Sequence, residues 1–203
     1  MLKLNNFKNV GYLQHTFNSE DLDPVLKEIE KIQSDFLAAK SSNKNLAGNI
    51  EHEYVLEECL EHVENLISKF IPIYSMNFGY KMSNMTKPHK LTSLWVNYQK
   101  KHEFNPAHTH TGEYSFVIWI KIPYNIHIEK VRNSSINSNT NVPGHFEFQY
   151  TNCLGNIQSE YIPADSSMEN TMLLFPSELR HSVAPFYTSD DYRISISGNF
   201  NLL

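Results

Sequence analysis

Two histidines separated by one residue, His108 and His110, are the first candidates for chemistry in this 203-residue chain. They precede an apolar segment, residues 114–120, whose pattern predicts a buried strand. Side chains two residues apart on extended backbone point to the same side, so both imidazoles can face one metal ion. Glu113 follows three residues later and offers a carboxylate as a further ligand.

A third histidine and a buried cation are expected near the C-terminus. Residues 171–175 predict a buried strand, and residues 192–200 alternate in polarity as a half-buried strand does. Neighbouring antiparallel strands would direct His181 and Arg193 into one cavity. An arginine inside a barrel, on a strand that is otherwise apolar, requires an anion, and a carboxylate binds a guanidinium with two hydrogen bonds. Ser195 shares the face of Arg193 and can donate another hydrogen bond.

Three arrangements of metal ligands fit this pattern. In the first, His108, His110 and His181 all bind the metal. In the second, Glu113 supplies a carboxylate from the turn. In the third, His110 binds and His108 supports it. We rank them in this order, and in each the ligand types suit non-haem Fe(II), Zn or Mn.

The composition indicates a folded, sheet-rich protein. The chain is 40% hydrophobic and has 12 Phe and 11 Tyr, which favour strands. The formal net charge is −5, and the absence of any Lys/Arg run argues against duplex nucleic acid as a partner. No apolar run approaches the ~20 residues that cross a bilayer. Two cysteines, Cys59 and Cys153, are typical of reduced thiols, so we expect a cytoplasmic protein without a membrane partner. The Asn-rich, Ala-poor composition is also typical of an AT-rich genome such as that of a virus, which would place the protein in an infected host cell.

The pattern of elements predicts a mainly β fold with N-terminal helices. Helical spacing of apolar residues predicts helices over residues 19–40 and 53–74. About eight short strands with turn-rich connections follow, as in a double-sheet jelly roll or barrel. We expect a single domain over residues 1–203, with an N-terminal helical support region over 1–89 and a jelly-roll catalytic core over 90–203.

Two motifs resemble those of the 2-oxoglutarate/Fe(II)-dependent oxygenase superfamily. The first is Asn-Pro-Ala-His-Thr-His-Thr-Gly at residues 105–112, followed by the apolar strand. The second is Leu-Phe-Pro-Ser at residues 174–177, continued by His181 and by the alternating segment from Arg193 to Asn199. The similarity covers about residues 90–203 and is greatest to a prolyl-hydroxylase-like bacterial and phage branch. The usual first motif of the superfamily is His-x-Asp, and His110 stands in the place of its Asp.

The resemblance implies a double-stranded β-helix, the cupin-like jelly roll, with a metal site and a co-substrate site. It implies Fe(II) bound by three histidines: His108, His110 and His181. It implies 2-oxoglutarate chelating that metal, with its far carboxylate in a pocket formed by Arg193, Ser195, Tyr98 and Asn97.

The activity implied is hydroxylation of a protein side chain such as proline, or of a small molecule, with release of succinate and CO₂. One alternative is a cupin-like metal protein, an isomerase or a small-ligand binding module, that does not use 2-oxoglutarate. Such a protein needs no pairing of Arg193 with Ser195, and its glutamate usually lies further along the chain than Glu113. Another alternative is a phage-associated interaction protein whose site has been lost.

Overall fold

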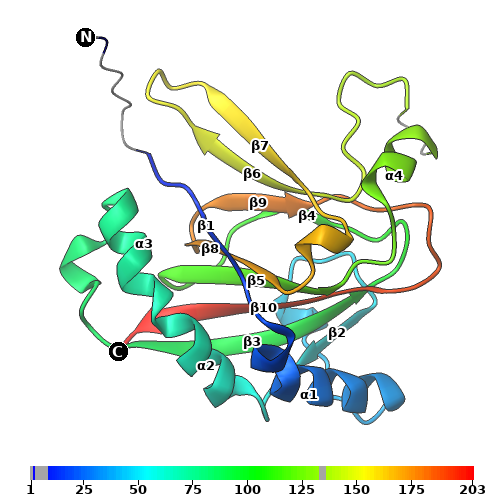
Figure 1. The fold of residues 1–203 in the computed structure, drawn as a ribbon, viewed down its shortest axis with the longest axis horizontal. Helices are drawn as coiled ribbons and strands as arrows, with labels where there is room; N and C mark the ends of the chain where they lie inside the picture. The colour runs from blue at the N-terminus through cyan, green and yellow to red at the C-terminus, as the bar shows by residue number, and fades with distance from the viewer. Residues whose placement is uncertain (1, 3–8, 133–135) are drawn as a thin grey trace.

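The computed structural model describes residue 2 and residues 9–132 and 136–203. Figure 1 shows the chain, whose described elements follow in sequence order. The helices are α1 (Asp23–Ser34), α2 (Leu60–Ser68), α3 (Phe70–Phe78) and α4 (Ile126–Arg132). The strands are β1 (Leu13–Thr16), β2 (His52–Val55), β3 (His89–Gln99), β4 (Asn105–His108), β5 (Tyr114–Lys121), β6 (His145–Thr151), β7 (Ile157–Pro163), β8 (Thr171–Pro176), β9 (Arg180–Val183) and β10 (Arg193–Leu202).

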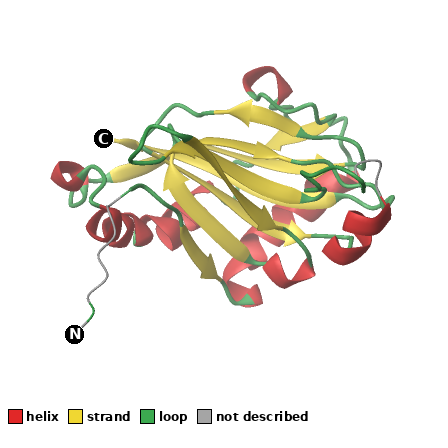
Figure 2. Cartoon of the chain, turned by 90° about the horizontal axis from the view of Figure 1, so that it is seen from above, coloured by secondary structure: helices red, strands yellow, loops and turns green. Residues whose placement is uncertain are grey.

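The strands form two antiparallel sheets. The major sheet has the order β1-β8-β5-β10-β3-β2, and the minor sheet has the order β4-β9-β6-β7. The minor sheet lies over one face of the major sheet, and α1, α2 and α3 cover the other face (Figure 1). Seen from above, the strands twist across the middle of the molecule and the helices lie around them (Figure 2). This is the mainly β, jelly-roll architecture that the sequence predicts.

The alternation of side chains along the central strands divides the interior into two cores. On β5, Phe116 and Ile118 pack against the helices, whereas Val117 and Trp119 face the minor sheet. Because successive strand residues point to opposite faces, one short apolar run can fill both cores. The sequence of β5 therefore reads as continuously hydrophobic, as expected for a strand buried on both faces.

Two further strands of the major sheet, β10 next to β5 and β3 next to β10, have polar residues on one of their faces. On β3 and β10 the residues that face the helices are apolar, and those that face the space between the sheets include polar side chains. On β10, Ile194 and Ile196 belong to the helix-side core, while Arg193, Ser195 and Ser197 line a cavity between the sheets. The strand register thus collects polar groups on one face of the major sheet.

The predicted helix over residues 53–74 differs from the observed structure. Glu53–Val55 belong to β2, which pairs with Trp95–Asn97 of β3, and the helical part is divided into α2 and α3. Pro72, the third residue of α3, has no N–H to continue the hydrogen-bonding pattern of α2, which accounts for the division. The predicted helical support region over 1–89 therefore also contributes β1 and β2 to the major sheet.

The remaining differences are local. Helix α1 ends at Ser34, earlier than predicted, and α4 was not predicted. Part of the polar run at residues 132–141 lies outside the described residues. In the described part of the chain, no helix combines the length and the apolar character needed to cross a membrane.

Candidate active site

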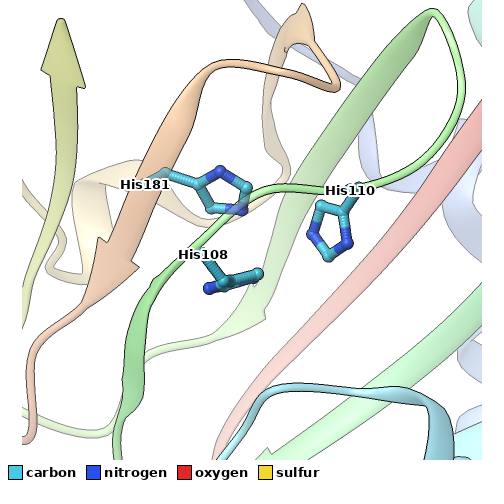
Figure 3. A group of neighbouring side chains, drawn as sticks. All are labelled: His108, His110 and His181. Atoms are coloured by element: carbon cyan, nitrogen blue, oxygen red, sulfur yellow. The ribbon is translucent and has the colours of Figure 1, made fainter.

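Three histidines from two parts of the chain meet at one end of the cavity between the sheets. His108 is the last residue of β4, and it pairs with His181 of β9 in the antiparallel register. His110 lies in the turn after β4, where its backbone N–H donates to the carbonyl of Ser177 at 2.9 Å. Figure 3 shows the three imidazoles pointing toward a common centre.

The geometry of this cluster fits a metal ion. One ligand atom from each ring lies within 4.8 Å of the others, and no other group of three His, Cys, Asp or Glu among the described residues does so. The Nδ1 atom of His108 donates to the carbonyl of Pro106 at 2.7 Å, and that of His181 donates to the carbonyl of Leu179 at 2.9 Å. Such bonds fix the tautomer and leave the lone pair of Nε2 free to bind a metal.

Burial keeps these rings in the neutral form. Loss of hydration lowers the pKa of His181 to about 3 and that of His110 to about 4, and the nearby His108 adds to both effects. Burial also lowers the pKa of His108. At neutral pH all three imidazoles are therefore uncharged, which is the form that coordinates a metal.

Glu113 lies apart from this cluster. Its carboxylate accepts hydrogen bonds from His89 and Asn84, each at 2.9 Å, and lies 3.4 Å from the ammonium of Lys81. Burial tends to raise the pKa of Glu113, but these partners outweigh it and hold the pKa below its usual value. The structure thus brings together His108, His110 and His181 and places Glu113 in a separate ion-paired group.

Arg193 carries a buried positive charge in the same cavity. The side chain is 2% exposed, and its five N–H groups are directed to neutral oxygens. Nε and Nη2 donate to Gln99 at 3.2 and 2.5 Å, and Nη2 also donates to the carbonyl of Ala184 at 3.1 Å. Nη1 donates to the Tyr124 hydroxyl at 2.6 Å and to the carbonyl of Gly144 at 3.3 Å. Because no carboxylate of the described residues pairs with it, the charge is left for an anion.

Gly144 is required in this arrangement. Its φ is +71°, and a Cβ there would lie 2.8 Å from the ring of Tyr124. Any larger residue would displace Tyr124, which donates to the Gly144 carbonyl at 3.1 Å. The turn therefore holds the hydroxyl against Arg193 only when glycine occupies this position.

Of the other residues predicted for the co-substrate site, two share the cavity with Arg193 and one does not. Ser195 pairs with Asn97 across β10 and β3, and the Nδ2 atom of Asn97 donates to the Ser195 hydroxyl at 3.4 Å. Tyr98 points to the other face of β3, where its hydroxyl donates to the carbonyl of Ile29 at 2.7 Å in the helix-side core. We therefore exclude Tyr98 from the co-substrate pocket.

Two residues that hold Arg193 by hydrogen bonds were not predicted. Gln99 follows Asn97 by two positions, so the alternation of β3 contained the signal that would have found it. Tyr124 comes from a connection with no recognisable motif. The cavity and its open mouth together contain about 610 Å³ of space between atoms.

Comparison with known proteins assigns a family to this architecture. Residues 93–199 match a family model described as "Putative 2OG-Fe(II) oxygenase". A comparison with curated proteins finds no match.

Solved structures share the fold. A prolyl-4-hydroxylase of Pseudomonas putida is 11% identical, with a TM-score of 0.58 over 96% of this chain and 94% of that one. A prolyl hydroxylase of Trichoplax adhaerens, solved with a peptide fragment of the hypoxia inducible factor oxygen degradation domain, is 12% identical, with a TM-score of 0.55 over 94% and 83%. An oxidoreductase of the 2OG-Fe(II) oxygenase family from Burkholderia pseudomallei is 15% identical, with a TM-score of 0.52 over 94% and 84%. At these identities the likeness concerns the fold.

The family match spans more than half of the chain, so the chain belongs to the 2OG-Fe(II) oxygenase family. It is an oxygenase that depends on non-haem iron, with Fe(II) as cofactor and 2-oxoglutarate as co-substrate. The predicted superfamily, jelly-roll fold, enzyme class and cofactors are confirmed. Three neutral imidazoles are also a donor set that suits Fe(II).

Proposed function

We propose that this oxygenase hydroxylates an organic substrate and converts 2-oxoglutarate to succinate and CO₂ in the same cycle. The observation that carries the proposal is one cavity that contains both a cluster of three neutral imidazoles and a buried arginine without an acidic partner. His108, His110 and His181 would hold Fe(II). Arg193 would attract the far carboxylate of 2-oxoglutarate by its positive charge, because all its N–H groups already donate to protein oxygens.

Two further side chains support the co-substrate assignment. Because Asn97 donates to the oxygen of the Ser195 hydroxyl, the proton of that hydroxyl is free to be donated to a carboxylate. The charge of Arg193 would then be balanced by the same carboxylate, and Gln99 and Tyr124 would hold the guanidinium in place. Asn97 thus acts in this pocket by orienting Ser195.

Aromatic side chains would keep this site dry. His181 stacks on Phe146 with ring centroids 5.5 Å apart, and Phe175 lies edge-on at 4.9 Å. Trp95 and Trp119 also line the cavity. When bound, Fe(II) and 2-oxoglutarate would activate O₂, which is the oxidant and would supply one oxygen atom to succinate and one to the hydroxylated substrate. The chain itself binds and orients them and excludes water that would compete with the substrate.

For the substrate we propose a protein side chain, such as proline, or a small molecule. Two of the solved structures with this fold are named as prolyl hydroxylases, and one of them contains a peptide. We also propose that residues 1–203 act as one domain, in which residues 1–89 support the core at 90–203. A cytoplasmic location is consistent with two free cysteines, the buried Cys59 and the exposed Cys153.

The test is an anaerobic titration with Fe(II) followed by 2-oxoglutarate. The expected result is the visible charge-transfer band of a chelated 2-oxo acid, and then succinate when O₂ is admitted. Arg193→Ala should bind Fe(II) normally but require at least about tenfold more 2-oxoglutarate. His181→Ala should give no band. Iron binding without any band or succinate in the wild type would contradict the proposal.

A further inference from the structure

A second group of polar side chains faces the same cavity and is separate from the histidines and Arg193. It consists of Glu53 on β2, Asn97 on β3 and Asn105 on β4, and we call it the acceptor corner. Glu53 and Asn97 are direct partners in the register of β2 and β3. The corner is therefore held by the backbone pairing of the major sheet.

Gly48 permits the close approach of two of these side chains. A Cβ at Gly48 would lie 2.4 Å from Oδ1 of Asn105 and 2.7 Å from Oε1 of Glu53. The two oxygens therefore converge on one small region beside the Gly48 backbone. The next residue, Asn49, donates its N–H to the carbonyl of Phe104 at 2.9 Å, which ties this loop to the start of β4.

The oxygens of the acceptor corner have few donors. In the part of the chain that the structure describes, Oδ1 of Asn97 and Oδ1 of Asn105 are buried without a hydrogen-bond partner. Glu53 is 1% exposed, and among the described residues its carboxylate receives only a long hydrogen bond, 3.4 Å, from Asn43. Buried polar atoms are nearly always paired in folded proteins, so three such side chains in one cavity indicate a ligand that donates.

The charges around the corner define this ligand further. No Lys, Arg or His of the described residues lies within 4 Å of the Glu53 carboxylate. Burial, together with the negative charge of Glu103, raises the pKa of Glu53 to about 7. Glu103 itself accepts from the backbone N–H groups of Glu51 and Lys100, and the Lys100 ammonium pairs with Glu51 at 2.7 Å. At neutral pH the Glu53 carboxyl is therefore partly ionised, and no cation of the described residues compensates its negative charge.

We propose that the acceptor corner binds a cationic nitrogen group, an ammonium or a guanidinium, on the substrate of this oxygenase. The inference rests on the proposed function and adds a substrate class to it. An ammonium has three donors and a guanidinium has five, so either group has at least one donor for each of the three acceptor side chains. Either group also balances the negative charge of Glu53. A carboxylate such as that of 2-oxoglutarate has only lone pairs to offer and would be repelled. A neutral amide would leave the Glu53 charge unbalanced.

The test uses the full chain loaded with Zn(II) and 2-oxoglutarate, and three probes of similar shape: butylguanidinium, butylammonium and the neutral butylurea. Binding is measured by ligand-observed NMR titration. At least one cation should bind at least about tenfold more tightly than butylurea. The cation that binds more tightly shows whether the cationic group of the substrate resembles that of arginine or that of lysine. Glu53→Gln, which keeps the size of the side chain and one accepting oxygen but removes the negative charge, should remove this preference.

Two further variants separate contact from general charge. Glu51→Gln removes a nearby exposed carboxylate that does not line the cavity and should leave the preference unchanged. Gly48→Ala adds a methyl group against Glu53 and Asn105. It should weaken binding of the cation, because the ends of both side chains must move. Equal binding of butylurea and the cations, no binding of any cation, or an unchanged preference in Glu53→Gln would overturn the inference. The charge-transfer band of iron with 2-oxoglutarate is scored separately, so its loss would be a failure of the proposed function alone.

Discussion

His108 and His181 face each other across β4 and β9, with ring centroids 4.4 Å apart. The two rings come from motifs far apart in the sequence, yet the register of one short strand pair places them together. A metal ion between them would link the two strands of the minor sheet to the turn that contains His110. The cluster is consequently the point where ligand binding and local folding are coupled.

The first prediction concerns the ligands. His181→Ala should lower the affinity for Zn(II) or Fe(II) by more than about 100-fold, because changes to groups that only orient a ligand already cost about 10–100-fold. Calorimetric titration of the metal measures this. His145→Ala is a matched control, since His145 is also buried and bonds a carbonyl through Nδ1 but lies outside the cluster. Equal metal affinity in the His181 variant and the control would contradict the ligand assignment.

The second prediction concerns the acidic residue beside the motif. Glu113→Gln should leave metal affinity within about threefold of the wild type, because the carboxylate is bonded to His89, Asn84 and Lys81 instead of facing the cavity. Its free energy of unfolding should fall by about 1–2 kcal/mol as a charged hydrogen-bond acceptor is lost. Chemical denaturation and metal titration of the same sample measure both quantities. Loss of the metal in this variant would restore Glu113 as a ligand.

The third prediction tests the exclusion of Tyr98 from the pocket. Tyr98→Phe removes the hydrogen bond to the Ile29 carbonyl and should lower stability by about 1 kcal/mol. The affinity for 2-oxoglutarate should not change, whereas Ser195→Ala should weaken it. Titration of 2-oxoglutarate into the iron-loaded variants compares the two. A weakening in Tyr98→Phe as large as that in Ser195→Ala would show that the tyrosine reaches the co-substrate.

The fourth prediction concerns pH. The pKa of Glu53 is raised to about 7 in the folded protein, above its ordinary value of 4.5. Its protonated form therefore stabilises the fold below pH 4.5, and this contribution is lost as the pH rises through about 7. Relative to Glu53→Gln, the wild type should lose up to about 3 kcal/mol of unfolding free energy over that interval.

The control for this experiment is Glu51→Gln. The hydrogen bond from Lys100 lowers the pKa of Glu51 from 4.5, so its contribution to stability is lost only as the pH falls below that value. The difference between the wild type and Glu51→Gln should therefore be nearly constant over the interval in which Glu53 titrates. Urea denaturation at several pH values gives the difference curves. A flat difference between the wild type and Glu53→Gln from pH 4.5 to 8 would contradict the raised pKa.

The proximity of the three histidines and the position of Arg193 in the cavity could be predicted because both follow from local spacing. The two-residue spacing of His108 and His110 determines that they share a face wherever the strand lies, and the alternation of β10 does the same for Arg193 and Ser195. The sequence pattern did not show which strands pair with β4 and β10, and the structure provides this pairing. The same rule could have excluded Tyr98, since a residue next to Asn97 must point to the other face of β3.

The acceptor corner could not be predicted because it depends on pairing over long distances. Residues 53–55 continue the apolar stripe that leads into α2, so their helical periodicity concealed a four-residue strand. What makes them a strand is the exposed edge of β3, with which they pair, and strand preference depends on such context more than on the residue itself. Glu53 was therefore expected to begin a helix.

The hydrogen bonds of Arg193 have a consequence for the rate of co-substrate binding in the proposed site. Its guanidinium joins four separate segments through Gln99, Tyr124, Gly144 and Ala184, so its rotamer is set during folding. A long, flexible side chain normally loses conformational entropy when it captures a ligand, and here that loss precedes the encounter. The proposed pocket is therefore preorganised. The Arg193 side chain already has its final conformation when the dianion arrives, so binding needs no rearrangement of this residue.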